Sequence, residues 1–327
     1  ALMAVSFHYN TCTMSLFLGD PGYLETQAGS EAALLPIQNG NAALLGQSGP
    51  SLAASNDSML SRRESFDFFI ESHHRWLQRK GIHIRQMKDE AAVQRRERKE
   101  PPKFNGRQFW QWHYEPSFHC DLTERIGAMG DGHKWVCNPS RITEQVSEGK
   151  PCLVYSFGSC GQFDFEEAVL KHISTQCEIH TFDPAPMSKW AEGLRKYRDV
   201  IPHIKYHRAC LGAPGVNTSS TVQGIKCKPL SQIVNELGHK GRDIDLFKID
   251  CETCEWDTFE DWIAAPVLIR QMNVELHYRG EAKAHSFFQT LFNSGYVVHV
   301  KEPNILGCGG SCIEYGLIKL ATSFGVA

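Results

Sequence analysis

The sequence predicts an α/β fold: a mostly parallel sheet of seven strands, covered by helices on both faces and ending in an antiparallel hairpin. Two observations lead to this prediction. From position 151 onward, short apolar runs alternate with segments of helical periodicity, which is the pattern of parallel strands joined by crossover helices. The last two apolar runs, 296–300 and 313–320, have no helix between them. They must therefore pair antiparallel, because a parallel connection needs a long crossover.

Each expected element rests on its own apolar pattern. The expected strands are 152–157, 178–182, 204–211, 244–249, 271–276, 296–300 and 313–320. The expected helices are 163–173, 230–237, 256–264 and 282–292. Strand 244–249 is apolar at four of its six positions, as expected for a strand that helices cover on both faces.

The chain divides into four segments by composition. Residues 1–60 are rich in Ala, Gly, Ser, Asn and Leu and are expected to be a disordered, low-complexity segment. Residues 61–100 are expected to form a charged helical segment, and 101–149 an aromatic-rich lead-in packed on the main domain, 150–322. The net charge of −3 does not indicate a nucleic-acid partner. No run of 18 or more apolar residues predicts a membrane span.

A glycine-containing turn follows the first expected strand. Glycines at a strand-to-helix turn let the backbone approach a ligand closely and supply N–H groups at a helix start. Asp183 ends the second strand, 25 residues after Gly158, where an acid can accept hydrogen bonds from both hydroxyls of a ribose. A nicotinamide nucleotide would use the same acid, and a turn-capping role for Asp183 stays open. The candidate cofactor-binding residues are Phe157, Gly158, Ser159, Gly161, Asp183 and Asp250.

Polar side chains also follow the fourth and fifth expected strands. Asp250, Glu252 and Glu255 follow the fourth strand, and Glu275 and His277 lie on one face at the end of the fifth. The candidate catalytic residues are Asp250, His277 and Glu252, because a carboxylate or an imidazole can take the proton of a hydroxyl. Asp250 and Glu275 are the candidate ligands of a divalent ion, Mg²⁺ or Mn²⁺. Glu255 is expected only to cap the helix that follows it.

A family resemblance rests on three of these segments. The run LFKIDCETCEW at 246–256 closely resembles the Lys-Ile-Asp-Val-Glu-Gly-Ala-Glu-Trp block of FkbM-type methyltransferases. The segments 130–137 and 154–159 look like a related, animal-type branch of methyltransferase-like proteins, and the likeness covers about 110–320. Thr253 stands where that family usually has Gly, and the usual Gly-Ala-Asn after the first strand is absent.

The resemblance implies a Rossmann-like class-I methyltransferase with S-adenosylmethionine as cofactor. It further implies O-methylation of a hydroxyl on a sugar or small molecule, so a small-molecule or glycan partner is expected and nucleic acid is not. Two alternatives remain. A non-catalytic Rossmann-like binding domain (a pseudo-methyltransferase) is favoured by the departures in the glycine loop. A nucleotide-dependent oxidoreductase is disfavoured by the last strand pair, which has no helix between its strands.

Twelve cysteines are many for a cytosolic enzyme of this length. The expected pairs, if disulfides form, are Cys152 with Cys177, Cys120 with Cys137, and Cys210 with Cys227. Paired cysteines would place the protein in the secretory pathway or outside the cell, and free thiols would place it in the cytoplasm. Cys251-x-x-Cys254 and Cys308-x-x-x-Cys312 fall at one edge of the sheet. A four-thiolate zinc site, separate disulfides and free thiols all stay open for these four residues.

Overall fold

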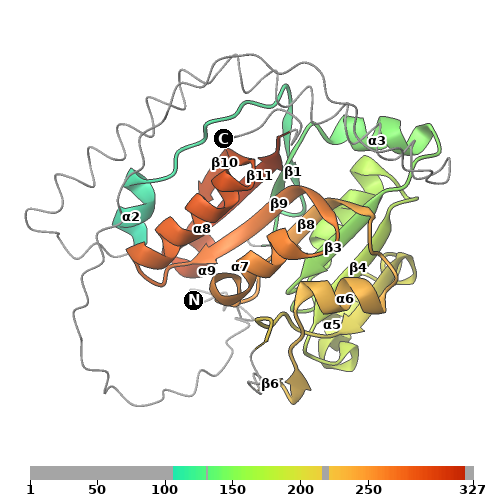
Figure 1. The fold of residues 1–327 in the computed structure, drawn as a ribbon. Helices are drawn as coiled ribbons and strands as arrows, with labels where there is room; N and C mark the ends of the chain where they lie inside the picture. The colour runs from blue at the N-terminus through green and yellow to red at the C-terminus, as the bar shows by residue number, and fades with distance from the viewer. Residues whose placement is uncertain (1–105, 130–131, 216–220, 321–327) are drawn as a thin grey trace, which may run out of the picture. The chain divides into compact units, whose positions relative to one another are not determined.

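The computed structural model describes residues 106–129, 132–215 and 221–320 (Figure 1). The expected disordered segment 1–60 and the expected charged helix 61–100 lie outside these ranges. No helix in the described ranges is both long enough and apolar enough to cross a membrane.

A seven-stranded sheet forms the centre of the fold, with the strand order β10-β11-β9-β8-β3-β4-β5 (Figure 1). The strands are β3 (Leu153–Phe157), β4 (Glu178–Asp183), β5 (Ile204–Arg208), β8 (Asp243–Ile249), β9 (Leu268–His277), β10 (Tyr296–Pro303) and β11 (Cys312–Lys319). The five strands from β9 to β5 are parallel, and β11 runs antiparallel to both of its neighbours. The predicted α/β fold with a mostly parallel sheet and an antiparallel C-terminal pair is thus confirmed.

The last strand does not add to the edge of the sheet but lies between β9 and β10. Its register places Cys312 opposite His277 and Glu314 opposite Glu275. All eight residues of β11 are buried, because helices and the lead-in cover both of its faces. The C-terminal strand therefore brings its own side chains beside the end of β9.

Helices cover the two faces of the sheet in two hydrophobic clusters. One cluster joins the sheet to α3 (Pro139–Ser147), α4 (Asp164–Ala168), its π-helical continuation η1 (Val169–Ile173) and Tyr197. The other joins it to α6 (Leu230–Glu236), α7 (Glu255–Ala264) and α8 (Glu281–Asn293). The expected helix 163–173 is thus two segments of different helical type.

Short elements complete the described chain. They are η2 (Met187–Trp190), α5 (Ala191–Lys196), η3 (Ile201–His203), the hairpin β6 (Thr221–Val222) and β7 (Ile225–Lys226), and α9 (Ile305–Cys308). The sequence did not predict α5, and the expected strand 204–211 ends at Arg208.

The described part of the lead-in consists of α2 (Gly106–Trp112), the antiparallel hairpin of β1 (Thr123–Ile126) and β2 (Lys134–Cys137), and helix α3. Phe109 and Trp110 are buried in the same cluster as α7 and α8. The indole N–H of Trp110 donates to the carbonyl of Ser311, 3.2 Å away. This part of the lead-in thus contributes side chains directly to the main core.

Five disulfides join pairs of described cysteines. They are Cys120–Cys137, Cys152–Cys177, Cys210–Cys227, Cys251–Cys254 and Cys308–Cys312. The three expected pairs all form. The last two are separate short-range bridges, so the four-thiolate zinc alternative is wrong: their thiolates are not available to a metal.

Candidate active site

The glycine turn after β3 touches the end of β8 backbone to backbone. Gly158 has φ +79°, and a Cβ built on it would lie only 1.6 Å from the carbonyl oxygen of Asp250. The approach is held by backbone bonds from Gly158 N to Phe182 O at 2.9 Å and from Asp250 N to Phe157 O at 3.1 Å. Lys248, a buried residue of β8, also donates to the carbonyl of Gly158 at 2.9 Å. A side chain at position 158 is therefore excluded by the fold itself.

Asp183 ends β4 beside this turn and is already hydrogen-bonded to the protein. Its Oδ2 accepts from the backbone N–H of Cys160 at 2.8 Å and from the hydroxyl of Ser159 at 3.4 Å. Its Oδ1 accepts from the backbone N–H of Ala185 at 2.9 Å. A carboxylate offers about four acceptor positions, so capacity for a ligand hydroxyl remains although the side chain is buried.

The loop between β8 and α7 has an unusual backbone. Glu252 and Thr253 both have positive φ, +53° and +87°. A β-branched residue in this region is a genuine outlier, and each such residue costs about 1–3 kcal/mol. The Cys251–Cys254 disulfide closes the loop, and Arg279 donates to the Thr253 hydroxyl at 3.2 Å. Thr253 is the position where FkbM-type sequences have Gly, and the positive φ explains why Gly suits it.

His277, at the end of β9, is oriented by Glu255. One oxygen of the fully buried Glu255 accepts from the backbone N–H of His277 at 2.9 Å and lies 3.2 Å from its Nδ1. The Nε2 of His277 lies 3.4 Å from Glu252. Burial opposes protonation of His277, but the hydrogen bond to Glu255 and the neighbouring acids raise its pKa to about 10. Glu255 is thus more than the helix cap that the sequence suggested, because its carboxylate fixes the imidazole.

Asp250 and Glu275 share the interior of the cluster with Lys134 from β2. The ammonium of Lys134 lies 2.6 Å from Glu314 and 3.9 Å from Asp250. Burial opposes ionisation of Asp250, but Lys134 and Lys248 together hold its pKa below the usual range. Burial, and then the charges of Asp250 and Glu314, raise the pKa of Glu275 well above its usual value. The two neighbouring carboxyl groups thus differ: Asp250 loses its proton more readily than an ordinary carboxyl group, and Glu275 less readily.

Two groups of side chains near His277 have metal-ligand spacing. One ligand atom each from Asp250, Glu252 and His277 lie within 4.8 Å of one another. Glu275 belongs to a second group, with His277 and Cys312. The sulfur of Cys312 is tied up in its disulfide, and Glu275 accepts from the Asn304 amide at 2.8 Å. The first group is the better ligand set, with Glu252 in the place that the sequence assigned to Glu275.

The structure brings most of the candidate residues together at the carboxyl ends of the parallel strands. The ends of β3, β4, β8 and β9 carry Gly158, Asp183, Asp250 and His277 respectively. Sequence reasoning missed Lys134, Lys248, Glu255 and Glu314, which set the charge of the cluster from within. Lys134 lies in a segment without visible periodicity, and Glu314 on a strand whose place in the sheet the sequence did not reveal.

Comparison with known families shows the family of this chain. Residues 59–319 match the model of a family described as a methyltransferase domain. The chain belongs to this family. The family and the fold imply S-adenosylmethionine as the cofactor, and the seven-stranded sheet is the Rossmann-like class-I sheet expected from the sequence.

Two curated relatives resemble this methyltransferase domain over a shorter stretch. The human protein named "Probable methyltransferase-like protein 24" is 33% identical over 150 residues, which cover 43% of this chain and 37% of that protein. The Rattus norvegicus protein of the same name is 32% identical over 134 residues, 39% of this chain and 33% of that protein. The matched region therefore covers only about a third of either relative's length.

Solved structures resemble the domain only distantly. The fibrillarin pre-rRNA processing protein of Methanococcus jannaschii has a TM-score of 0.34 and 8% sequence identity, covering 61% of this chain and 83% of that chain. A precorrin-6y C5,15-methyltransferase from Geobacter metallireducens has a TM-score of 0.33 and 9% identity, covering 56% and 87%. Neither comparison bears on the substrate.

Proposed function

We propose that the domain is an S-adenosylmethionine-dependent O-methyltransferase that acts on a hydroxyl of a sugar or another small molecule. The observation that carries the proposal is the cluster of Asp250, Glu252 and His277 beside the glycine turn. Ligands of open parallel sheets bind at the carboxyl ends of the strands, where this cluster lies. Membership of the methyltransferase-domain family supports the cofactor.

In this proposal the turn at Gly158 and the carboxylate of Asp183 hold the cofactor. The remaining acceptor capacity of Asp183 suits the two ribose hydroxyls, and Ser159 and Gly161 line the same turn. When bound, S-adenosylmethionine supplies a methyl group on a positively charged sulfur. The lowered pKa of Asp250, whose backbone touches Gly158, would favour a negative charge beside the glycine turn.

The proton of the acceptor hydroxyl is the harder part of the reaction. Asp250 has a lowered pKa and is a weak base, while His277 holds its own proton because its pKa is raised to about 10. Neither of these two side chains is thus a base matched to neutral pH. Release of the His277 proton would leave Nε2, Asp250 and Glu252 as a nitrogen-and-oxygen ligand set. A divalent ion such as Mn²⁺ or Mg²⁺ in that set would make a nearby hydroxyl more acidic.

The test combines binding and turnover. Calorimetry with S-adenosylhomocysteine measures the cofactor site, and transfer of a labelled methyl group to a panel of sugars and hydroxylated small molecules measures turnover. We expect His277→Gln to reduce turnover about 100-fold while cofactor affinity stays within about threefold. Asp257→Asn is the matched control, because Asp257 is an exposed acid on the first turn of α7. Full turnover in His277→Gln would refute the role given to this residue.

One observation favours a second function, a non-catalytic binding domain. Asp183 is buried and already accepts hydrogen bonds from the turn that it is proposed to share with the cofactor. If wild-type protein binds no S-adenosylhomocysteine, this alternative replaces the enzyme. Methyl transfer by the wild-type protein to any member of the acceptor panel would exclude it.

A further inference from the structure

A second cluster of titratable side chains lies near the amino ends of the parallel strands, opposite the candidate active site at their carboxyl ends. Glu178 begins β4 and His180 follows two residues later, so both side chains project from the same face. His239 lies in the loop between α6 and β8. Asp183, at the other end of β4, is five residues from Glu178, a distance of about 17 Å along a strand. The cluster is therefore separate from the glycine turn.

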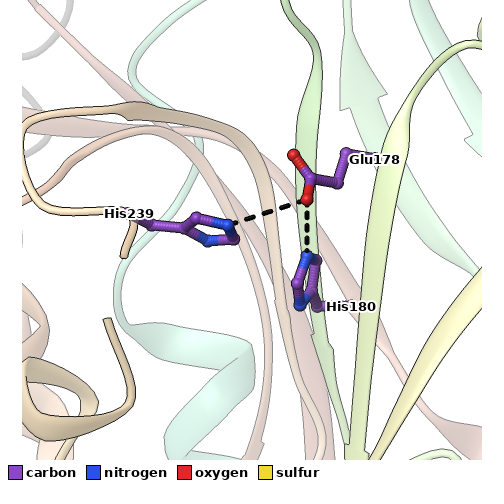
Figure 2. Close-up of side chains that lie close together, drawn as sticks. All are labelled: Glu178, His180 and His239. Atoms are coloured by element: carbon purple, nitrogen blue, oxygen red, sulfur yellow. Dashed lines mark hydrogen bonds and ion pairs between the residues drawn. The ribbon is translucent and has the colours of Figure 1, made fainter. Parts of the chain in front are cut away.

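The three side chains converge on one point (Figure 2). The Nε2 of His180 lies 3.1 Å from Oε1 of Glu178, and the Nε2 of His239 lies 3.7 Å from the same oxygen. The ligand atoms all lie within 4.8 Å of one another. Ligand atoms of a tetrahedral zinc ion, each about 2.0–2.1 Å from the metal, lie about 3.4 Å apart. The two imidazoles meet at an interplanar angle of 83°, so they approach the point from different directions.

The other polar atom of each side chain is held by a partner. The Nδ1 of His180 lies 2.9 Å from Nε2 of His207, and the Nδ1 of His239 lies 2.6 Å from the hydroxyl of Tyr155. The second oxygen of Glu178 accepts from Arg242 at 2.7 Å. Metal-binding histidines characteristically have such a partner on the ring nitrogen that does not touch the metal, because it fixes the tautomer and the ring orientation.

We propose that Glu178, His180 and His239 bind a zinc ion that ties the start of β4 to the loop before β8. Two imidazoles and a carboxylate form a donor set that suits zinc, and a water molecule would complete the tetrahedron. Both histidines are nearly fully buried, and the partly exposed Glu178 gives solvent access to the fourth position.

The protonation states agree with this assignment. Burial lowers the pKa of His180 to about 4 and also lowers that of His239, so both rings are neutral at pH 7 and each can offer a lone pair. Burial opposes ionisation of Glu178, but hydrogen bonds from Lys205, His180 and Arg242 hold its pKa far below the usual range. Glu178 is therefore a carboxylate, the form that binds a metal.

Lys205 competes directly for the ligand oxygen of Glu178. Its ammonium pairs with Oε1 of Glu178, while Arg242 pairs mainly with Oε2. The Lys205 side chain is 59% exposed, so it can turn into solvent at little cost when a metal arrives. Removing this ammonium should therefore strengthen zinc binding. If the three residues formed only a structural hydrogen-bond network, loss of Lys205 would not increase the affinity for zinc.

The experiment measures zinc on the full, disulfide-bonded chain. Protein stripped with a chelator is titrated with Zn²⁺ against a coloured competitor, and Co²⁺ is substituted to record its visible spectrum. All measurements are made both in the wild-type protein and in the His277→Ala variant, whose candidate active site lacks one of its possible metal ligands. We expect one zinc per chain in both backgrounds, and an intense, four-coordinate Co²⁺ spectrum.

Variants assign the ligands. The double variant His180→Ala/His239→Ala should bind no zinc at this site. Glu178→Gln keeps the size of the side chain and should weaken zinc affinity about 100-fold. It tests the proposal even if the double variant does not fold. Lys205→Ala should tighten affinity about fivefold, equivalent to about 1 kcal/mol. His203→Ala, an exposed histidine just before β5, is the matched control and should change nothing. No zinc in wild-type protein, or zinc kept in Glu178→Gln and lost only in His277→Ala, would overturn the proposal.

Discussion

Gly158→Ala is the change whose cost the structure defines most clearly. The new Cβ would meet the carbonyl oxygen of Asp250 at 1.6 Å, far inside van der Waals contact, and that oxygen is part of the backbone. The turn cannot move aside freely, because Gly158 N is bonded to Phe182 and Gly158 O to Lys248. The two strand ends must therefore separate.

The magnitude follows from two contributions. A left-handed alanine costs about 1 kcal/mol relative to glycine. Separation of the strand ends breaks about two hydrogen bonds, each worth about 1 kcal/mol net. The expected loss in the free energy of unfolding is therefore about 3 kcal/mol, measured by urea denaturation of oxidised protein with tryptophan fluorescence.

Gly149→Ala provides the matched control. Gly149 has nearly the same φ, +81°, and an added Cβ would meet nothing within 4 Å. The free energy of unfolding of Gly149→Ala should fall by only about 1 kcal/mol, the cost of a left-handed alanine relative to glycine. The reasoning is refuted if Gly158→Ala costs no more than Gly149→Ala, because the close approach to Asp250 would then have no energetic weight.

Three further predictions concern the candidate active site. Asp183→Ala should weaken S-adenosylhomocysteine binding about tenfold to 100-fold by calorimetry in a folded protein, and unchanged affinity would remove it from the cofactor site. Glu255→Gln should lower the pKa of His277 from about 10 toward 6.5, followed by NMR of the imidazole. A group whose pKa is higher in the folded than in the unfolded protein stabilises the folded state. For His277 this contribution is complete below pH 6.5, the pKa in the unfolded chain, and is lost as the pH rises through the pKa in the folded protein. Wild type should therefore exceed the variant in stability near pH 6 and lose this advantage as the pH rises through about 10; a pH-independent difference would contradict it. Thr253→Gly should raise the free energy of unfolding by about 1 kcal/mol by removing the positive-φ strain, and a loss in urea denaturation would show that the Thr253 contacts outweigh it.

The order of strands and helices could be predicted because apolar periodicity is a local signal. The antiparallel last pair was predicted because no helix was expected between residues 300 and 313. The structure does place a helix there, but α9 has only four residues and is too short to be the crossover of a parallel connection. The glycine turn and Asp183 follow directly from the ends of two strands. The insertion of β11 between β9 and β10 could not be predicted. An antiparallel pair with β10 next to β9 and β11 outside it would have the same local pattern of apolar residues.

The charge of the site was hidden for the same reason. Lys134 and Glu314 are 180 positions apart in the chain, yet they form an ion pair, and both contribute to the shifted pKa of Glu275. Glu255 looked like a helix cap because it does begin α7, and only the end of β9 reveals its second role. Such pairings depend on tertiary register, for which a single sequence carries no local pattern.

The position of β11 has a consequence for synthesis on the ribosome. Among the strands that the structure describes, β10 pairs only with β11, and β9 has its second neighbour only when β11 arrives. Until residues 312–319 emerge, the nascent chain exposes two unpaired strand edges, the kind of surface that invites association with other chains. The sheet is therefore completed only after nearly the whole domain has been synthesised.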